Sequence, residues 1–270
     1  MDDRPIGVFD SGLGGLTTVR ELCRLLPEED IVYFGDTGRV PYGSRSRETI
    51  VKYARQDVAF LRTFDLKTIV IACGTVSTTA LDVLAAENPI PVLGVVAPAA
   101  RAAARATRSG SIGLIGTQAS IRSGAYERLI RAENPAARVL AQPCPLFVPL
   151  VENGRFRPGD VVIETVAAEY LAPLREAGVD TLVLGCTHYP LLEKVIGAYM
   201  GPEVRLINSG AEGARAAADC LRERDALAGP GRGSCRCFGS DRQEDFSRLA
   251  STFLGWDVAQ AVEQVDISQY

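Results

Sequence analysis

A chain of 270 residues can form one large domain or two modest ones, each with its own buried core. Its net charge of −4, without a run of Lys and Arg residues, argues against a general nucleic-acid-binding protein. The seven cysteines do not suggest a disulfide scaffold, the first residues lack the apolar core of a signal peptide, and no apolar run approaches the ~18 residues that span a bilayer. We therefore expect a cytoplasmic protein with reduced thiols that binds neither nucleic acid nor membrane.

The first predicted strand, residues 6–9, runs into a glycine-rich turn, residues 10–15, before a predicted helix over residues 16–26. The turn differs from a Walker phosphate-binding loop because no Gly-Lys-Ser/Thr sequence follows it. The carboxylate of Asp10 would also repel an anion bound beside it. We therefore interpret Asp10 as a group that handles a cation or a proton, with helix capping as the structural alternative.

The rest of the first half alternates predicted strands with predicted helices. Ligand contacts in α/β domains collect where strands end, so the polar loop after the second strand and the Cys73-Gly74-Thr75 turn after the third are candidate binding segments. A domain boundary is expected at Ala97-Pro98. The predicted elements are strands over residues 31–34, 69–72 and 91–96 and helices over residues 48–64, 76–86 and 99–107.

The second half repeats the alternation, with one irregular region. Pro145 and Pro149 argue against a regular helix or a central strand between residues 139 and 154. Glu152 follows an apolar run there, and it is either a half-buried carboxylate or a solvated loop acid. The other predicted elements are strands over residues 111–115, 182–185 and 204–207, helices over residues 126–133, 160–177 and 213–224, a strand-like run at residues 235–237 and a closing strand within residues 256–265.

The most informative segment is the turn after the strand at residues 182–185. It contains Cys186, Thr187 and the only histidine, His188, and Pro190 indicates the start of a helix. A cysteine at the carboxyl end of a strand lies near free backbone N–H groups of the next helix, where a thiolate is stabilised. An inert core cysteine is the alternative, since cysteine is among the most buried residue types.

This arrangement occurs twice in the chain. Cys73 also follows an apolar strand and precedes a helix, and the strands that begin at Ile6 and Ile112 are separated by nearly the same number of residues as the two cysteines. Two α/β halves of similar design are therefore predicted, each ending a strand in its own cysteine. Such a fold can bring Cys73 and Cys186 to one cleft with the thiols facing each other.

Four sequence blocks together span most of the chain: residues 7–17, residues 33–43, residues 144–152 and residues 184–192. In these blocks the sequence resembles the bacterial glutamate racemases, a family that needs no cofactor. The resemblance implies an α/β fold of two pseudo-symmetric domains with mainly parallel sheets and an active site in the cleft between them, divided here as residues 1–97 with 208–270 and residues 98–207.

The resemblance also implies the roles of individual residues. Cys73 and Cys186 act from opposite faces of glutamate, Asp10 and His188 assist them, and Glu152 lies near His188. Where the family usually has Cys-Asn-Thr this chain has Gly74 in place of Asn, and Ser120 stands where Thr is common. The expected substrate-binding residues are Asp10, Ser11, Pro41, Tyr42, Gly43, Gly74, Thr75, Thr117, Ser120 and Thr187.

The implied reaction explains why two thiols are needed. Racemisation removes the α-proton from one face and returns a proton to the other, so one thiolate and one thiol exchange roles, and a free cysteine with a pKa of about 8.5 gives access to both forms. The family role is the supply of D-glutamate for peptidoglycan. Gly74 raises the alternatives of an aspartate or other amino-acid racemase, and of a weakened racemase scaffold that acts as a binding or regulatory protein. A cysteine hydrolase would leave Cys73 and Asp10 without roles.

We expect no cofactor and no metal. The turns hold no lysine for pyridoxal phosphate, and the single residue between Cys235 and Cys237 is a poor match to zinc-site spacing. The expected partner is the small-molecule substrate, and a homodimer is the one protein partner that we consider.

Overall fold

A computed structural model describes residues 1–241, 246–256 and 262–270, and the strands of these ranges form two sheets in which every neighbouring pair is parallel. The larger sheet has the strand order β10-β9-β2-β1-β3-β4. Its strands are β1 (Ile6–Asp10), β2 (Ile31–Gly35), β3 (Thr68–Ile71), β4 (Val92–Gly94), β9 (Cys235–Gly239) and β10 (Glu263–Gln264).

The smaller sheet has the order β6-β5-β7-β8, which repeats the order β2-β1-β3-β4 of the larger one. The repeated sequence features therefore correspond: β1 and β3 are parallel neighbours in one sheet, and β5 and β7 are parallel neighbours in the other. Its strands are β5 (Ser111–Gly116), β6 (Arg138–Pro143), β7 (Thr181–Leu184) and β8 (Arg205–Asn208).

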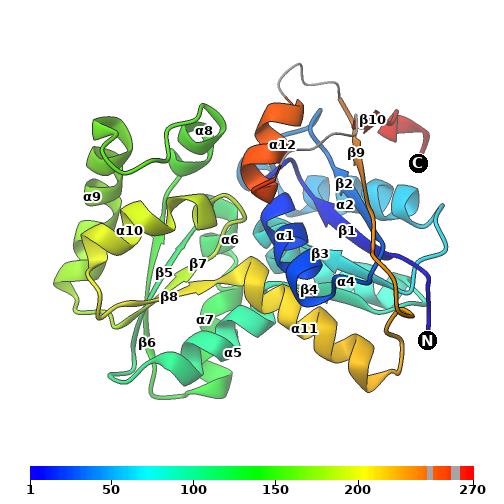
Figure 1. The fold of residues 1–270 in the computed structure, drawn as a ribbon. Helices are drawn as coiled ribbons and strands as arrows, with labels where there is room; N and C mark the ends of the chain where they lie inside the picture. The colour runs from blue at the N-terminus through cyan, green and yellow to red at the C-terminus, as the bar shows by residue number, and fades with distance from the viewer. Residues whose placement is uncertain (242–245, 257–261) are drawn as a thin grey trace.

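Helices cover both faces of the larger sheet, which explains why β1 and β2 are buried along their whole length. On one face α1 packs against α11 and α12, and on the other α2 packs against α3 and α4 (Figure 1). Side chains alternate along β1, so Ile6 and Val8 join the core of α1 whereas Phe9 joins the core of α2. These helices are α1 (Leu16–Leu25), α2 (Arg47–Leu61), α3 (Gly74–Thr79), α4 (Leu81–Glu87), α11 (Ser209–Glu223) and α12 (Phe246–Leu254).

The smaller sheet is covered in the same way, and α11 joins the two halves by packing against both α1 and α5 (Figure 1). One hydrophobic core continues from Val8 and Leu16 of the first half to Phe147 and Leu182 of the second. The helices of this half are α5 (Val96–Ala106), α6 (Gln118–Arg122), α7 (Ala125–Glu133), α8 (Phe147–Glu152), α9 (Val161–Glu176) and α10 (Glu193–Met200), and the chain adds the 3₁₀ turns η1 (Tyr42–Ser44), η2 (Tyr189–Leu192) and η3 (Ile267–Gln269).

The structure corrects the interpretation of Pro149. It does not exclude a helix, because it is the third residue of α8, and N–H groups of a first helical turn have no partner within the helix. The helix predicted over residues 99–107 begins earlier, at Val96, with Pro98 in its first turn. Of the closing strand expected within residues 256–265, only Glu263–Gln264 is a strand, and residues 257–261 lie outside the described residues.

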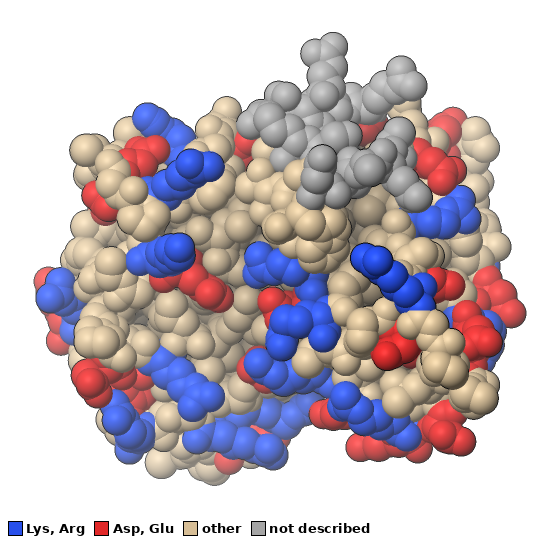
Figure 2. Space-filling view, viewed as in Figure 1, with Lys and Arg blue, Asp and Glu red and all other residues tan. Residues whose placement is uncertain are grey.

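Two surface properties follow from the same description. Basic and acidic side chains are interspersed over both halves of the face shown in Figure 2. Within the described ranges of the chain, none of the helices is long and apolar enough to span a bilayer.

The strand order determines where a binding site can form. In the larger sheet β2 lies on one side of β1 and β3 on the other, so the direction of chain progression across the sheet reverses at β1. Ligands of open parallel sheets bind at the carboxyl ends of the strands that flank such a reversal. Asp10 ends β1 and Cys73 follows β3. In the smaller sheet the equivalent positions after β5 and β7 carry Thr117 and Cys186.

Candidate active site

A cavity of about 400 Å³ lies at these strand ends, and residues of both halves line it. Cys73 and Cys186 are both free, both buried and both part of its wall. All of the sequence-predicted site residues line the cavity except Asp10 and Ser120; those that do are Ser11, Pro41, Tyr42, Gly43, Cys73, Gly74, Thr75, Thr117, Glu152, Cys186, Thr187 and His188.

On the first side of the cavity, Cys73 is held as a thiol. It occupies the position before α3, and its Sγ lies 3.3 Å from Ser11 Oγ, to which it donates. Burial and the nearby charge of Asp10 raise the pKa of Cys73 to about 12, against the smaller opposing effect of its polar contacts with Ser11 and with the backbone of Val76.

Asp10 lies beneath this part of the cavity. Its Oδ2 accepts a hydrogen bond of 3.1 Å from the N–H of Gly12, and its buried Oδ1 has no hydrogen-bond partner within the described ranges. Burial raises the pKa of Asp10, although the charge of His188 opposes the shift. The capping alternative is wrong, because Gly15 precedes α1 and no side chain caps that helix.

The glycines of the first turn are required by close packing. A Cβ at Gly14 would collide with the Thr187 hydroxyl and lie 2.5 Å from His188 Nδ1, and a Cβ at Gly15 would collide with Asp10. The turn of the first half therefore packs directly on the turn of the second half. This contact, which joins segments far apart in the sequence, accounts for glycines that also resemble a phosphate-binding loop.

On the second side, His188 lies between a thiol and a carboxylate. Its Nδ1 is 3.9 Å from Cys186 Sγ, its Nε2 is 3.0 Å from Glu152 Oε1, and Phe253 of α12 meets the ring edge-on. Burial disfavours the charged ring, but the hydrogen bonds and negative charges of Cys186 and Glu152 outweigh burial and raise the pKa of His188 to about 10. At neutral pH the imidazole is therefore protonated.

A chain of hydroxyl groups crosses the cavity between the two halves. Thr75 Oγ1 lies 3.0 Å from Thr117 Oγ1, and Thr117 Oγ1 donates to Ser120 Oγ at 3.0 Å. Ser120 does not line the cavity and contacts it through Thr117. Thr187 Oγ1 lies 3.4 Å from His188 Nδ1.

Gly74 has no space for a side chain. A Cβ there would lie 2.6 Å from the carbonyl oxygen of Gly185, which is backbone of the opposite half and cannot rotate away. The departure from the family pattern therefore coincides with direct backbone contact between the two cysteine-bearing turns.

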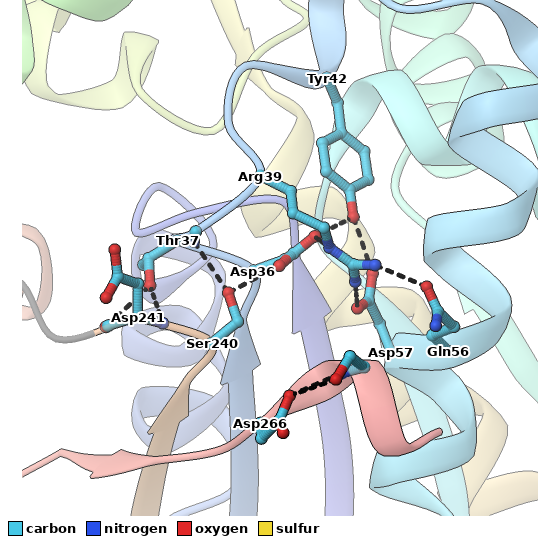
Figure 3. Close-up of polar contacts among 11 residues, drawn as sticks. Asp36, Thr37, Arg39, Tyr42, Gln56, Asp57, Ser240, Asp241 and Asp266 are labelled. Carbon is cyan, nitrogen blue, oxygen red and sulfur yellow. Dashed lines mark hydrogen bonds and ion pairs between the residues drawn. The ribbon is translucent and has the colours of Figure 1, made fainter.

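The hydroxyl of Tyr42 points away from the cavity, into a buried cluster with Asp36 and Asp57 (Figure 3). Tyr42 and Gly43 line the cavity, and a Cβ at Gly43 would lie 3.1 Å from Thr117 Cβ. Any contact of Tyr42 with a ligand must therefore use its backbone or ring.

Sequence reasoning missed part of the cavity wall. Within the described part of the chain, the wall contains no Lys or Arg, and its charged groups are Glu152 and His188. No group of three or more His, Cys, Asp or Glu side chains that could hold a metal ion occurs among the described residues. Correct placement of α8 would have pointed to part of the missed wall, which consists of Gly12, Val40, Ser44, Gln118, Cys144, Pro145, Val148, Pro149 and Gly185.

Comparison with known proteins agrees with this geometry. Residues 9–217 match the family model described as Asp/Glu/Hydantoin racemase. The chain is 49% identical over 256 residues to a glutamate racemase of Geobacter metallireducens, covering 94% of each. Its fold matches a glutamate racemase of Francisella tularensis in complex with D-glutamate (TM-score 0.92, 37% identity, 100% of both chains) and one of Thermus thermophilus in complex with β-chloro-D-alanine (TM-score 0.89, 43% identity, 100% of both chains). The chain belongs to the Asp/Glu/Hydantoin racemase family.

Proposed function

We propose that this protein interconverts L-glutamate and D-glutamate without a cofactor, by removing the α-proton with one cysteine and returning a proton with the other. The observation that carries the proposal is that two free thiols, one from each half of the fold, line one cavity of about 400 Å³. The choice of substrate is supported by glutamate racemases that match this chain over nearly their whole length, one of which was solved with D-glutamate.

The neighbours of the two thiols support different resting states. Cys73 has a pKa of about 12 and stays a thiol at neutral pH, whereas Cys186 Sγ lies 3.9 Å from Nδ1 of the protonated imidazole of His188. In the first half-reaction the thiolate of Cys186 takes the α-proton and becomes a thiol. The carbanion then takes the proton of Cys73 on the opposite face, and Cys73 becomes a thiolate. The opposite enantiomer follows the same steps in reverse.

Returning to the resting state requires that Cys186 lose a proton and Cys73 gain one. His188 first passes its Nε2 proton to Glu152, whose half-buried carboxylate releases it to water, and the neutral ring then accepts the proton of Cys186 at Nδ1. Asp10, whose charge acts on Cys73, is the corresponding group on the other side, because its raised pKa allows it to take up a proton and pass it to the thiolate of Cys73. Each cysteine thus has its own proton partner.

The wall of the cavity suggests how the substrate is held. Because no Lys or Arg of the described residues lines it, the carboxylates of glutamate would bind backbone N–H groups, hydroxyl groups and the imidazolium of His188. Ser11, Thr75, Thr117 and Thr187 supply hydroxyls at the wall. Val40 and Val148 supply apolar side chains at the wall.

The biological role that fits this activity is the supply of D-glutamate for peptidoglycan. A cytoplasmic location and a homodimer stay predictions. We also propose the predicted division into residues 1–97 with 208–270 and residues 98–207, because each sheet draws its strands from one of these parts, apart from the last residue of β8, Asn208.

The proposal is tested with purified protein and no added cofactor in deuterated water. L-glutamate and D-glutamate are supplied separately, and the optical signal and deuterium at the α-carbon are followed. We expect both enantiomers to reach the same racemic mixture, with solvent deuterium in the product. L-aspartate is the matched control. If L-aspartate is turned over faster than L-glutamate, aspartate and not glutamate is the substrate. A lack of deuterium exchange with either amino acid would instead favour a binding protein on a racemase scaffold.

A further inference from the structure

Behind the cavity wall, two carboxyl groups share one phenol. Asp36, which follows β2, and Asp57 of α2 are both fully buried, and the hydroxyl of Tyr42 lies between them (Figure 3). The hydroxyl is hydrogen-bonded to Asp36 Oδ2 and lies 2.9 Å from Asp57 Oδ2. Arg39 reaches both acids, with Nε 2.7 Å from Asp36 Oδ2 and one terminal nitrogen 2.6 Å from Asp57 Oδ1.

The number of protons in this cluster is fixed by its contacts. A phenol has a single O–H, so Tyr42 can donate to only one of the two acids, and the second contact needs a proton on a carboxyl group. Asp36 already accepts hydrogen bonds from Arg39 and from Ser240, the latter at 2.7 Å. Asp57 Oδ2 faces only the phenol oxygen in the described structure, so the additional proton belongs on Asp57.

We infer that Asp57 is a positioning residue of the substrate cavity, which holds the segment at residues 41–44 by donating a hydrogen bond, as a neutral carboxylic acid, to the phenol oxygen of Tyr42. The inference rests on the proposed function, since the segment matters for catalysis only if substrate binds beside it. Pro41, Tyr42, Gly43 and Ser44 all line the cavity. Gly43 packs on Thr117 of the opposite half, so a shift of this segment changes the width of the cavity.

The charges around Asp57 favour the neutral form. Asp36 as a carboxylate and Arg39 as a cation cancel, so a neutral Asp57 leaves the buried cluster without net charge. Burial and the charge of Asp36 raise the pKa of Asp57 well above its usual range, although Arg39 opposes the shift.

The other charged groups on elements packed against α2 are turned to different partners. Asp82 and Glu87 of α4 pair with Arg47 and Arg55, and the carboxylate of Asp266 accepts hydrogen bonds from Ser268 and Gln269. Asp10 of β1 accepts a hydrogen bond from the N–H of Gly12. On α2 itself, Gln56 accepts from Arg39 at 2.6 Å, and the ring of Tyr53 lies 4.2 Å below the guanidinium of Arg39. These contacts fix Arg39 between the two acids and leave the phenol as the only hydrogen-bond partner of Asp57 Oδ2 in the described structure.

Two matched substitutions separate positioning from general structural support. In Asp57→Asn the amide is neutral and donates to the phenol oxygen, so KM for glutamate at neutral pH should stay within about twofold of wild type. In Asp36→Asn one of the two acceptor oxygens becomes a donor, which faces either Arg39 and Tyr42 at the Oδ2 position or Ser240 at the Oδ1 position, and the charge that balances Arg39 is lost. KM should therefore rise by about tenfold or more, with a smaller change in kcat. Equal increases of KM in both variants would overturn the inference.

The proton itself is observed without substrate. Infrared difference spectra of the full protein at neutral pH should contain the carbonyl stretch of a protonated buried carboxyl group, which disappears in Asp57→Asn and persists in the exposed control Asp82→Asn. A raised folded-state pKa means that the folded protein binds the additional proton, so the unfolding free energy of wild type should fall relative to Asp57→Asn as pH rises above about 4.

The outcomes distinguish the two proposals. Absence of a carboxyl band that Asp57→Asn removes would overturn the neutral acid, whatever the activity. If that band is present but the protein turns over neither enantiomer of glutamate, Asp57 is still a neutral acid. The proposed function, and with it the positioning role, would then be wrong.

Discussion

Gly74 and Gly185 meet backbone to backbone at the cavity, so closely that a Cβ on Gly74 would lie 2.6 Å from the carbonyl oxygen of Gly185. Each glycine is adjacent in sequence to one of the two cysteines. The contact therefore sets the separation of the turns that carry the thiols. The thiols in turn must lie on opposite faces of one small substrate in the proposed reaction.

Adding a side chain at position 74 should widen this separation. Gly74→Ala and Gly74→Asn force the opposing backbones apart at a cost of about 1–3 kcal/mol, and we expect kcat/KM for glutamate to fall by about tenfold or more. Racemisation assays and thermal unfolding of the same samples provide the measurement. Gly197→Ala is the control, because its Cβ would meet Leu206 at an ordinary 3.8 Å. Full activity of Gly74→Ala would contradict the tight contact.

The fold was largely predictable because its signals are local. Apolar runs mark the buried parallel strands, and the repeated strand-cysteine-helix pattern reappears as the shared strand order of the two sheets. The errors have a local cause as well. Pro149 was expected to exclude a helix, yet it occupies the first turn of α8, where proline is tolerated. Sequence spacing alone does not distinguish a proline that ends a helix from one that begins it.

The candidate site was less predictable, because its details depend on contacts between distant segments. The turns that the sequence marked do meet at one cavity, with Asp10 and Ser120 just behind its wall. The sequence could not show that the hydroxyl of Tyr42 points away from the cavity, since Asp57, to which it is hydrogen-bonded, belongs to a different element. The reason for Gly14 lies likewise in Thr187 and His188 of the other half.

Removing one thiol should separate proton removal from proton return. In Cys73→Ala, racemisation of glutamate should fall by at least about 10²-fold, because one face has lost its proton donor or acceptor. The thiolate of Cys186 can still exchange the α-proton of one enantiomer with solvent. We therefore expect deuterium in one enantiomer of glutamate and none in the other, measured by mass spectrometry after chiral separation.

Cys186→Ala provides the mirror-image control, with exchange restricted to the opposite enantiomer or lost. Exchange of both enantiomers by a single-cysteine variant would contradict two bases on opposite faces. Cys220→Ala, at a residue that does not line the cavity, should leave both rates unchanged.

The ion pair between His188 and Glu152 should control the alkaline limit of activity. The pKa of His188 is raised to about 10 by Cys186 and Glu152, so Glu152→Gln should lower that pKa and move the alkaline limb of the kcat profile to lower pH. We expect the ratio of kcat in Glu152→Gln to kcat in wild type to decrease as pH rises from 7 to 10. An unchanged alkaline limb in Glu152→Gln would contradict this role.

The same pair has a defined effect on stability. Because the folded-state pKa of His188 is raised from 6.5 to about 10, its contribution is fully present below about pH 6.5 and is lost as pH rises to about 10. The difference in unfolding free energy between wild type and Glu152→Gln should therefore be largest near pH 6 and shrink toward pH 10. Its size is reduced by solvent, because the Glu152 side chain is 37% exposed.

Asp10 should control the thiol of Cys73 by its charge. The negative charge of Asp10, after burial, is the second cause of the raised pKa of Cys73, so Asp10→Asn should lower that pKa and increase the thiolate fraction at a given pH. Alkylation by a small reagent, followed residue by residue with mass spectrometry, measures this change. We expect Cys73 to react faster in Asp10→Asn from pH 8 to 10, while Cys235, which lies outside the cavity wall, reacts as in wild type. Racemisation should nevertheless fall by about tenfold or more, since the only proton partner proposed for Cys73 is lost. Slower alkylation of Cys73 in this variant would mean that Asp10 acts on the thiol by something other than its charge.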